Sequence, residues 1–245
     1  MRVAVLGGCG GIGRSLVAAL LAQGDNVAVL DLPASLERHP PPDGVAAIPV
    51  DASDAASVTD AFAAVEAMWG ALDGFVNLAG FMLGMKPLRD VTPDAFDTTV
   101  DGNLRSTFLA CTAAVKLLDK GEAASLVNVS SGLAQFVRPH YGPYAAAKAG
   151  MIALTKTLAH EHAPKVRCNV VAPGAVDTAF LRGGTGRSGE DGQTTIDIAA
   201  YSAMLPLKRI ADADDIVGPI LFLLGSGSRY MTGQSLWVNG GAYMP

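Results

Sequence analysis

Short runs of apolar, largely β-branched residues alternate along the chain with longer alanine-rich segments that have a helical period. The apolar runs are continuous rather than alternating, which is typical of strands covered on both faces of a sheet. We predict strands at residues 2–6, 26–30, 46–50, 74–78, 125–129, 166–171 and 234–238. Helices are expected near residues 11–23, 54–69, 93–119, 143–161 and 212–224.

Strands that alternate with helices favour a parallel sheet with right-handed crossovers and with helices on both faces. We see no internal repeat and no sign of a second domain, so we expect one α/β domain over residues 1–245. Its doubly wound parallel sheet should contain seven strands.

Two segments interrupt the alternation. Residues 32–44 are rich in proline and are expected to form a plain connection after the second strand. Residues 181–195 hold five glycines and few apolar side chains. A loop of that length in a compact domain is usually functional or disordered. We predict that it forms a lid over a site, within an insertion that spans residues 179–204.

Composition narrows the possible partners. Half of the 245 residues are hydrophobic, 17% are charged, and the net charge is −5. The sequence shows no basic cluster, which argues against nucleic acid or an anionic membrane as partners. No apolar run is long enough to span a bilayer, and no signal segment precedes the first strand, so we expect a cytoplasmic protein. The spacing of Cys9, Cys111 and Cys168 fits neither a metal site nor a disulfide framework, so we expect no metal.

The first predicted strand leads into the glycine-rich stretch GGCGGIGR, which contains two overlapping patterns. One is Gly8-x-Gly10-x-x-Gly13 and the other is Gly7-x-x-x-Gly11-x-Gly13. Both place a glycine turn between a strand and a helix. Glycines there let the backbone approach a pyrophosphate, and the helix N-terminus favours its negative charge. The context therefore predicts a dinucleotide site.

Asp31 follows the second predicted strand, 18 residues after Gly13. A carboxylate at that place can accept hydrogen bonds from the ribose hydroxyls of adenosine and would repel a 2′-phosphate. It therefore favours NAD(H) over NADP(H) as the cofactor. Arg14 and Arg38 are nearby cations that would weaken this preference.

A candidate proton-transfer group lies in the stretch YGPYAAAK. Tyr144 and Lys148 are four residues apart and would meet on one helix face, whereas Tyr141 precedes Lys148 by seven residues. Proline is favoured at the first helical position, so Pro143 should start the helix and give only Tyr144 a fixed geometry with the lysine. A nearby ammonium and an oxidised nicotinamide would lower the pKa of the phenol from its usual value near ~10.

Two serines, Ser130 and Ser131, end the strand predicted at 125–129. Ligands bind at the carboxyl edge of an open parallel sheet, so Ser131, which lies 13 residues before Tyr144, should share that edge with it. Its hydroxyl could donate a hydrogen bond to a substrate oxygen as charge develops there. By itself, Tyr-x-x-x-Lys also describes many surface helix pairs.

Taken together, these motifs resemble the short-chain dehydrogenase/reductase family, in its compact NAD(P)-dependent branch, over essentially the whole chain. The resemblance is carried by Gly7-x-x-x-Gly11-x-Gly13, VNLAG (76–80), Asn103 in DGNL, Ser131, Tyr144, Lys148, NVVAPGAVDT (169–178), PLKRIADADDI and YMTGQSLWVNGG. It implies a Rossmann fold and hydride transfer with a nicotinamide cofactor. Leu6 and Leu78 depart from the family, which usually has a threonine or serine and an asparagine at these places.

The resemblance also implies roles for individual residues. Tyr144 would be the acid/base, Lys148 would lower its pKa and hold the nicotinamide ribose, and Ser131 would orient the substrate oxygen. Asn103 would hold a water that links Lys148 to solvent. Cofactor contacts are expected from Gly7, Gly10, Gly11, Ile12, Gly13, Asp31, Asp51, Ala52, Asn77, Ala79, Gly80, Tyr144, Lys148, Pro173, Gly174, Val176 and Thr178.

The sequence carries less information about the substrate than about the cofactor. The stretch at 132–141 should line one side of the pocket, with Gln135, His140 and Tyr141 as candidate polar contacts. We expect an NAD(H)-dependent enzyme that interconverts a secondary alcohol and a ketone. Alternatives are an NADPH-dependent 3-oxoacyl-[acyl-carrier-protein] reductase, a catalytically idle nucleotide sensor and, disfavoured by chain length, a nucleotide-sugar epimerase. By analogy with the family, we expect a homotetramer.

Overall fold

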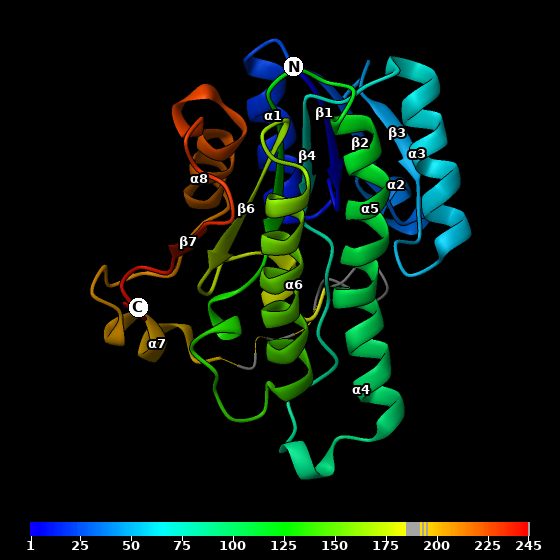
Figure 1. Cartoon of the computed structure of the whole chain (residues 1–245). Helices are drawn as coiled ribbons and strands as arrows, with labels where there is room; N and C mark the ends of the chain where they lie inside the picture. The colour runs from blue at the N-terminus through cyan, green and yellow to red at the C-terminus, as the bar shows by residue number, and fades with distance from the viewer. Residues whose placement is uncertain (185–191, 193, 195, 245) are drawn as a thin grey trace.

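A computed structural model describes residues 1–184, 192, 194 and 196–244 of the chain (Figure 1). Its strands form one sheet in the order β3-β2-β1-β4-β5-β6-β7, and every neighbouring pair is parallel. The order reverses between β1 and β4, so the sheet is doubly wound, as predicted. The strands are β1 Arg2–Leu6, β2 Asn26–Asp31, β3 Ala46–Pro49, β4 Gly74–Asn77, β5 Ala124–Val129, β6 Val166–Pro173 and β7 Ser235–Val238.

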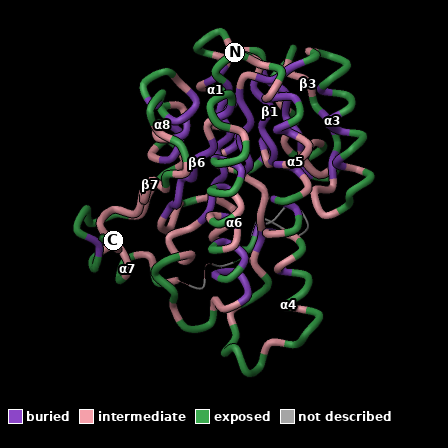
Figure 2. Tube along the Cα trace, in the orientation of Figure 1, coloured by how far each residue is buried: buried purple, intermediate pink, exposed green. Residues whose placement is uncertain are grey.

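Helices cover both faces of the sheet and leave its strands buried in the middle (Figures 1 and 2). Side chains of β1 alternate between two cores: Ala4 and Leu6 pack with α3, α5 and α6, whereas Val3 and Val5 pack with α1 and α8. The α-helices are α1 Gly11–Ala22, α2 Pro33–Arg38, α3 Ala55–Trp69, α4 Pro93–Val100, α5 Ser106–Leu118, α6 Gly142–Glu161, α7 Ile198–Met204 and α8 Asp214–Leu224. Short 3₁₀ turns lie at Leu88–Asp90, Gly132–Ala134, Ala179–Arg182 and Ser226–Ser228.

The long helix predicted over 93–119 is interrupted. A π-helical turn, Asp101–Arg105, separates α4 from α5. Inside it, Asn103 Nδ2 donates to the Thr99 carbonyl four residues back, at 2.8 Å. This side-chain amide competes with the backbone for that acceptor and so disturbs the regular helical hydrogen bonding. Turns of this kind often mark functional sites.

Two further helices differ from the prediction. The proline-rich connection at 32–44 contains α2, which begins at Pro33, a residue that favours the first helical turn. Helix α7 lies within the insertion predicted over 179–204, and the Asp197 side chain caps it by accepting from the Ala200 amide. Residues 185–191, 193 and 195 of the predicted lid lie outside the described part of the chain. The lid therefore stays a prediction.

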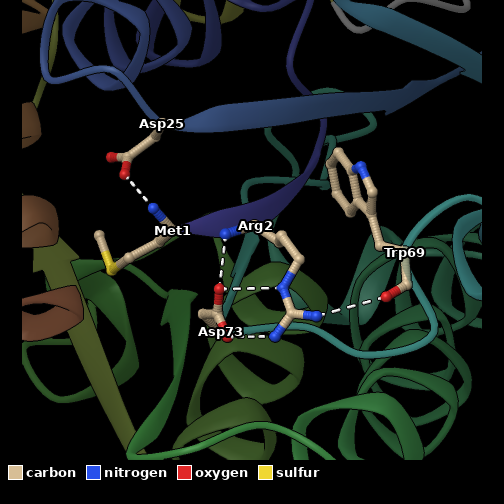
Figure 3. A network of polar contacts seen from close by, with 5 residues as sticks. All are labelled: Met1, Arg2, Asp25, Trp69 and Asp73. Atoms are coloured by element: carbon tan, nitrogen blue, oxygen red, sulfur yellow. Dashed lines mark hydrogen bonds and ion pairs between the residues drawn. The ribbon is translucent and has the colours of Figure 1, made fainter.

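A cluster of polar contacts closes the amino edge of the sheet (Figure 3). The Arg2 amide and Nε donate to Asp73 Oδ2 at 2.8 and 3.1 Å, and its Nη2 donates to Asp73 Oδ1 at 2.7 Å. Arg2 Nη1 also donates to the Trp69 carbonyl, and the Met1 amino group pairs with Asp25. These contacts tie the start of β1 to the turn before β4. The opposite, carboxyl edge is free to carry a site.

No helix in the described ranges is long and apolar enough to cross a bilayer. The same residues contain no group of three or more histidine, cysteine or acidic side chains placed to hold a metal ion. Cys9, Cys111 and Cys168 are all buried and free. The cytoplasmic location expected from the sequence stays a prediction.

Candidate active site

The glycine turn sits between β1 and α1 at the carboxyl edge of the sheet, and close contacts constrain most of its glycines. Gly7 has φ +81°, which favours glycine. A Cβ on Gly13 would lie 2.4 Å from the Gly7 carbonyl oxygen, and one on Gly11 would lie 2.6 Å from Thr178 Cγ2. At Gly10, the nearest atom would be 3.4 Å away. A Cβ on Gly8 would also lie 2.8 Å from Val29 Cγ1, so steric demand falls on Gly7, Gly8, Gly11 and Gly13, and Gly10 is the least constrained.

The amino end of α1 is built to receive an anion. Gly10 is its N-cap residue, no side chain caps this end, and the first turn has no acidic residue. The first amides of a helix have no partner within the helix, and the helix dipole adds partial positive charge at that end. Such a helix end suits a pyrophosphate.

A cavity of about 200 Å³ runs along this turn. At its far end, Asp31 Oδ2 accepts from the Cys9 amide at 2.9 Å, and Oδ1 accepts from the Leu32 amide at 2.8 Å. The carboxylate thus braces the turn while it faces the cavity. Burial and the neighbouring Asp31 raise the pKa of the Cys9 thiol to about 12, so that thiol is neutral. The predicted cofactor residues that line this cavity are Gly7, Gly10, Gly11, Ile12, Gly13, Asp31, Asp51, Ala52, Ala79, Gly80 and Thr178.

Asn77 lies apart from the cavity wall, although a cofactor contact was predicted for it. It is buried, and its Oδ1 accepts from the Ala79 amide at 3.1 Å. Its Nδ2 donates to Asn128 Oδ1 at 3.0 Å and to Thr107 Oγ1 at 3.2 Å. Asn77 therefore holds the backbone at Ala79, which does line the cavity. That places Asn77 behind the cavity wall.

Ser131, Tyr144 and Lys148 come together where β5 ends and α6 begins. Helix α6 starts at Gly142, with Tyr141 as its N-cap residue and a proline in its first turn. Tyr144 is buried and forms a hydrogen bond with the Ser131 side chain. Lys148 is also buried, with its Nζ 5.8 Å from the centre of the Tyr144 ring. The structure thus brings together Ser131, Tyr144 and Lys148, the three residues that the sequence predicted to act in one group.

The pKa values of the pair differ from the expectation. Burial raises the pKa of Tyr144 to about 12, against the opposing effect of its hydrogen bond with Ser131. Burial also lowers the pKa of Lys148 to about 7. Desolvation disfavours both charged forms, so the protein by itself favours a neutral phenol. The lowered tyrosine pKa predicted from the sequence needs additional positive charge beside the phenol.

Asn103 lies beneath this pair, in the π-helical turn. Its Nδ2 donates to the carbonyls of Phe81 and Thr99, both at 2.8 Å, and its Oδ1 is buried with no donor among the described residues. A Cβ on Gly80 would lie 2.7 Å from that oxygen and 3.0 Å from Lys148 Nζ. The free acceptor therefore faces the lysine side of the site. A buried acceptor without a donor suits a water molecule.

A second cavity, of about 560 Å³, opens over Ser131, Tyr144 and Lys148. It shares Ile12, Gly80 and Thr178 with the first cavity, so the two form adjoining parts of one site. Its wall also contains the predicted cofactor residues Pro173, Gly174 and Val176 and the predicted substrate residues His140 and Tyr141.

The third predicted substrate residue, Gln135, is exposed and is not among the residues that line this cavity. Several other lining residues were not predicted individually, and Arg138, Phe180 and Tyr201 are among them. Phe180 packs with its ring centre 6.1 Å from that of Tyr144, and Arg138 and Tyr201 line the wall. Arg138 lies in the stretch expected to line the pocket, but nothing in the sequence distinguished it from other loop arginines.

Comparisons with known proteins agree with the fold. A family model described as enoyl-(acyl carrier protein) reductase matches residues 7–243. An uncharacterized short-chain type dehydrogenase/reductase of Sinorhizobium fredii is 33% identical over 98% of this chain, which covers 43% of that relative. Carbonyl reductase (NADPH) 2 of Sus scrofa is 34% identical over 98% of this chain and 96% of its own. A 3-ketoacyl-(acyl-carrier-protein) reductase of Brucella melitensis, solved with NADH, has a TM-score of 0.89 at 27% identity, covering 99% and 98% of the two chains.

The doubly wound sheet, the glycine turn and the serine–tyrosine–lysine group define a nicotinamide-dependent oxidoreductase of the Rossmann class. The chain belongs to the short-chain dehydrogenase/reductase family.

Proposed function

We propose that the protein is an NAD(H)-dependent oxidoreductase that interconverts a secondary alcohol and a ketone. One observation carries the proposal: Ser131, Tyr144 and Lys148 line a cavity that shares Gly80 and Thr178 with the cavity along the glycine turn. A reacting oxygen beside Ser131 and Tyr144 would therefore lie next to the space suited to a dinucleotide. When bound, the nicotinamide supplies or accepts the hydride.

The chain's own residues provide the proton chemistry. The Ser131 hydroxyl can donate a hydrogen bond to the substrate oxygen, which favours the charge that develops there. The Tyr144 hydroxyl gives a proton to that oxygen during ketone reduction and takes one during alcohol oxidation. Lys148, when protonated, lowers the pKa of the neighbouring phenol and so favours its deprotonated form.

Proton supply to the buried pair needs a route. Lys148 Nζ donates to the Val129 carbonyl at 3.1 Å and has further N–H groups to donate. Asn103 Oδ1, which has no donor among the described residues, faces the same space. We propose that a water held by Asn103 carries protons between Lys148 and solvent. In this role Asn103 is a positioning residue.

The cofactor preference rests on Asp31. The Brucella relative was solved with NADH, and the name of the Sus scrofa relative specifies NADPH, so the relatives differ in this respect. In this chain the carboxylate of Asp31 lies in the wall of the first cavity, at the carboxyl end of β2. A fixed negative charge there favours ribose hydroxyls and opposes a 2′-phosphate. We therefore propose NAD(H) as the cofactor.

A second candidate function is favoured by two of the comparisons. The matching family model and the Brucella relative both carry acyl-carrier-protein reductase descriptions. An acidic carrier protein would need a basic surface at the pocket mouth, and the sequence contains no basic cluster. We place this activity second for that reason.

We also propose that the enzyme assembles as a homotetramer. A shallow groove between the α4–α5 segment and α6 is lined by Val100, Leu104, Phe108 and Leu154, and Phe108 is 50% exposed. An apolar surface of this kind suits a second copy of the chain. Analytical ultracentrifugation would show a species of four chains, and a monomer would refute this part of the proposal.

Initial rates test the function. A panel of secondary alcohols and ketones is assayed with NADH and NADPH and with their oxidised forms. We expect turnover with NAD(H) that the Tyr144→Phe variant loses while it still binds NADH, because only its proton-transfer group is missing. Tyr230→Phe serves as the control, because Tyr230 is fully exposed. Near-normal kcat in Tyr144→Phe, or a clear preference for NADPH, would overturn the respective part of the proposal.

A further inference from the structure

Arg138 stands out among the residues that line the second cavity. It is half-buried, and its guanidinium carbon lies 5.3 Å from the centre of the Phe136 ring and 5.6 Å from that of Tyr201. Within the described ranges it has no carboxylate partner and no hydrogen-bond acceptor. A guanidinium presents five N–H donors in one plane. Aromatic contacts engage its faces and leave those donors without partners.

The aromatic side chains around Arg138 are themselves held in place. Phe136 stacks on Tyr243, with ring centres 5.3 Å apart and planes 12° apart. Tyr243 in turn meets Trp237 edge-on at 5.9 Å. Tyr201, on α7, supports the other contact. Segments far apart in the sequence thus fix a planar cation at the cavity wall, which reduces the entropy lost when it binds a ligand.

The wall of the second cavity contains basic side chains and no acidic one among its described residues. Its described lining residues include Arg138, Lys148 and His140 but no aspartate or glutamate, although the whole chain has a net charge of −5. Nearby Arg182 shows the contrast, because its guanidinium is already paired with Asp177. A half-buried cation with unused donors gains most from an anionic ligand.

We propose that the substrate carries an oxyanionic group, a carboxylate or a phosphate, and that Arg138 binds it. This inference rests on the proposed function, because Ser131 and Tyr144 must hold the reacting oxygen of the same molecule. The planar fork of arginine matches both kinds of anion in a two-point contact. Arg138 is then the residue that selects oxo acids or ketone phosphates over neutral ketones.

Matched pairs of substrates test this selection. Two oxo acids, 4-oxopentanoate and 5-oxohexanoate, are compared with their methyl esters, and dihydroxyacetone phosphate is compared with dihydroxyacetone. We expect wild-type kcat/KM with NADH to favour at least one anion over its neutral partner. Arg138→Met should lower that preference roughly 10- to 100-fold, because a hydrogen-bonded charge contact is lost. The pair that responds identifies the carboxylate or the phosphate.

Two variants serve as controls. Arg138→Lys keeps the charge but loses the planar fork, so it should retain part of the preference. Arg182→Met removes a nearby cation that is already paired, so it should leave the ratio of anionic to neutral kcat/KM within about threefold of wild type. Binding is also measured without turnover. The Tyr144→Phe enzyme is loaded with NADH and titrated with each anion, with and without Arg138→Met.

The outcomes separate the two proposals. Equal kcat/KM for every anionic and neutral pair, or an equal loss on both members in Arg138→Met, would overturn the anion site. Even if the anion site is overturned in this way, the proposed function stands as long as neutral ketones react and Tyr144→Phe is inactive. If no compound of the panels reacts but the anions bind in an Arg138-dependent way, the anion site stands and the proposed function fails.

Discussion

The carboxamide oxygen of Asn103 and the ammonium group of Lys148 lie beside the same empty position, the one that a side chain of Gly80 would occupy. A Cβ there would lie 2.7 Å from Asn103 Oδ1 and 3.0 Å from Lys148 Nζ. Neither group can easily retreat, because two hydrogen bonds hold Asn103 and one holds Lys148. The absence of a side chain at Gly80 therefore keeps the space beside the proton-transfer pair open.

Adding one methyl group at Gly80 should damage catalysis directly. We expect Gly80→Ala to lower kcat at least about tenfold, because the methyl displaces Lys148 or Asn103, and misplacement of catalytic groups by 1 Å can cost about a hundredfold in rate. Overpacking should also lower the free energy of unfolding by about 1–3 kcal/mol. Steady-state kinetics and urea unfolding measure the two effects.

Gly218→Ala is the matched control. Gly218 lies in α8, and a Cβ there would meet nothing within 4 Å. Alanine in a helix interior is more stable than glycine by about 0.5–1 kcal/mol, so this variant should be at least as stable as wild type and equally active. Wild-type kcat in Gly80→Ala would show that the space beside Asn103 and Lys148 has no role in proton transfer.

The direction of the reaction should set the sign of its pH dependence. Alcohol oxidation needs the deprotonated form of Tyr144, whose pKa burial raises to about 12. The form with a phenolate beside a protonated Lys148 grows with pH until that lysine, whose pKa is about 7, loses its charge, so kcat/KM for oxidation should rise from about pH 5 and level off above about pH 7. Reduction needs the phenol, which dominates over the same range, so its kcat/KM should stay level. If kcat/KM for oxidation did not change with pH, Tyr144 would not be the base.

The strands could be predicted closely because most are short, largely apolar runs bounded by turn residues. The interruption of the helix over 93–119 was not predicted: Asn103 donates both to the Thr99 carbonyl, four residues back, and to the Phe81 carbonyl, 22 residues away, and the second contact has no local signature. The sequence did contain local signals for the two missed helices. Pro33 marks the start of α2, and Asp197 caps α7, but both helices are short enough that these signals were outweighed by the surrounding glycines and prolines.

In the candidate site, the sequence was informative where function depends on local spacing. Pro143 separated Tyr144 from Tyr141, and the structure places Tyr144 with Lys148 and Ser131. Arg138 shows the limit of such reasoning. What distinguishes it is the lack of a described partner and the contact with Tyr201, 63 residues later in the chain. Both are properties of the tertiary structure and have no local signature.

Cofactor preference should shift when the charge of Asp31 is removed. Asp31→Asn keeps an oxygen that can accept from the Cys9 amide but no longer repels a 2′-phosphate. We expect the ratio of kcat/KM with NADPH to that with NADH to rise about tenfold or more, equivalent to about 1.4 kcal/mol. Asp43→Asn is the control, because Asp43 is exposed in the loop before β3. An unchanged ratio in Asp31→Asn would assign the preference to other residues.

The Arg2–Asp73 contact at the opposite edge of the sheet should contribute to stability in a pH-dependent way (Figure 3). The hydrogen bond from Arg2 lowers the pKa of the Asp73 carboxyl, so the folded protein favours its charged form. The contribution is then fully present above the ordinary carboxyl pKa of about 4 and is lost as the pH falls through the lower folded-state pKa. We expect Asp73→Asn to cost about 1 kcal/mol at pH 7 and much less near pH 2.

Urea unfolding at several pH values measures this difference. Asp90→Asn is the control, because its contact with Arg89 is 3.8 Å long and the two side chains are 55% and 87% exposed. An exposed pair of that kind should contribute less than about 0.5 kcal/mol at any pH. If Asp73→Asn cost the same near pH 2 as at pH 7, its effect would come from lost packing or altered backbone geometry. The charge of the carboxylate would then have no part in holding β1 to the turn before β4.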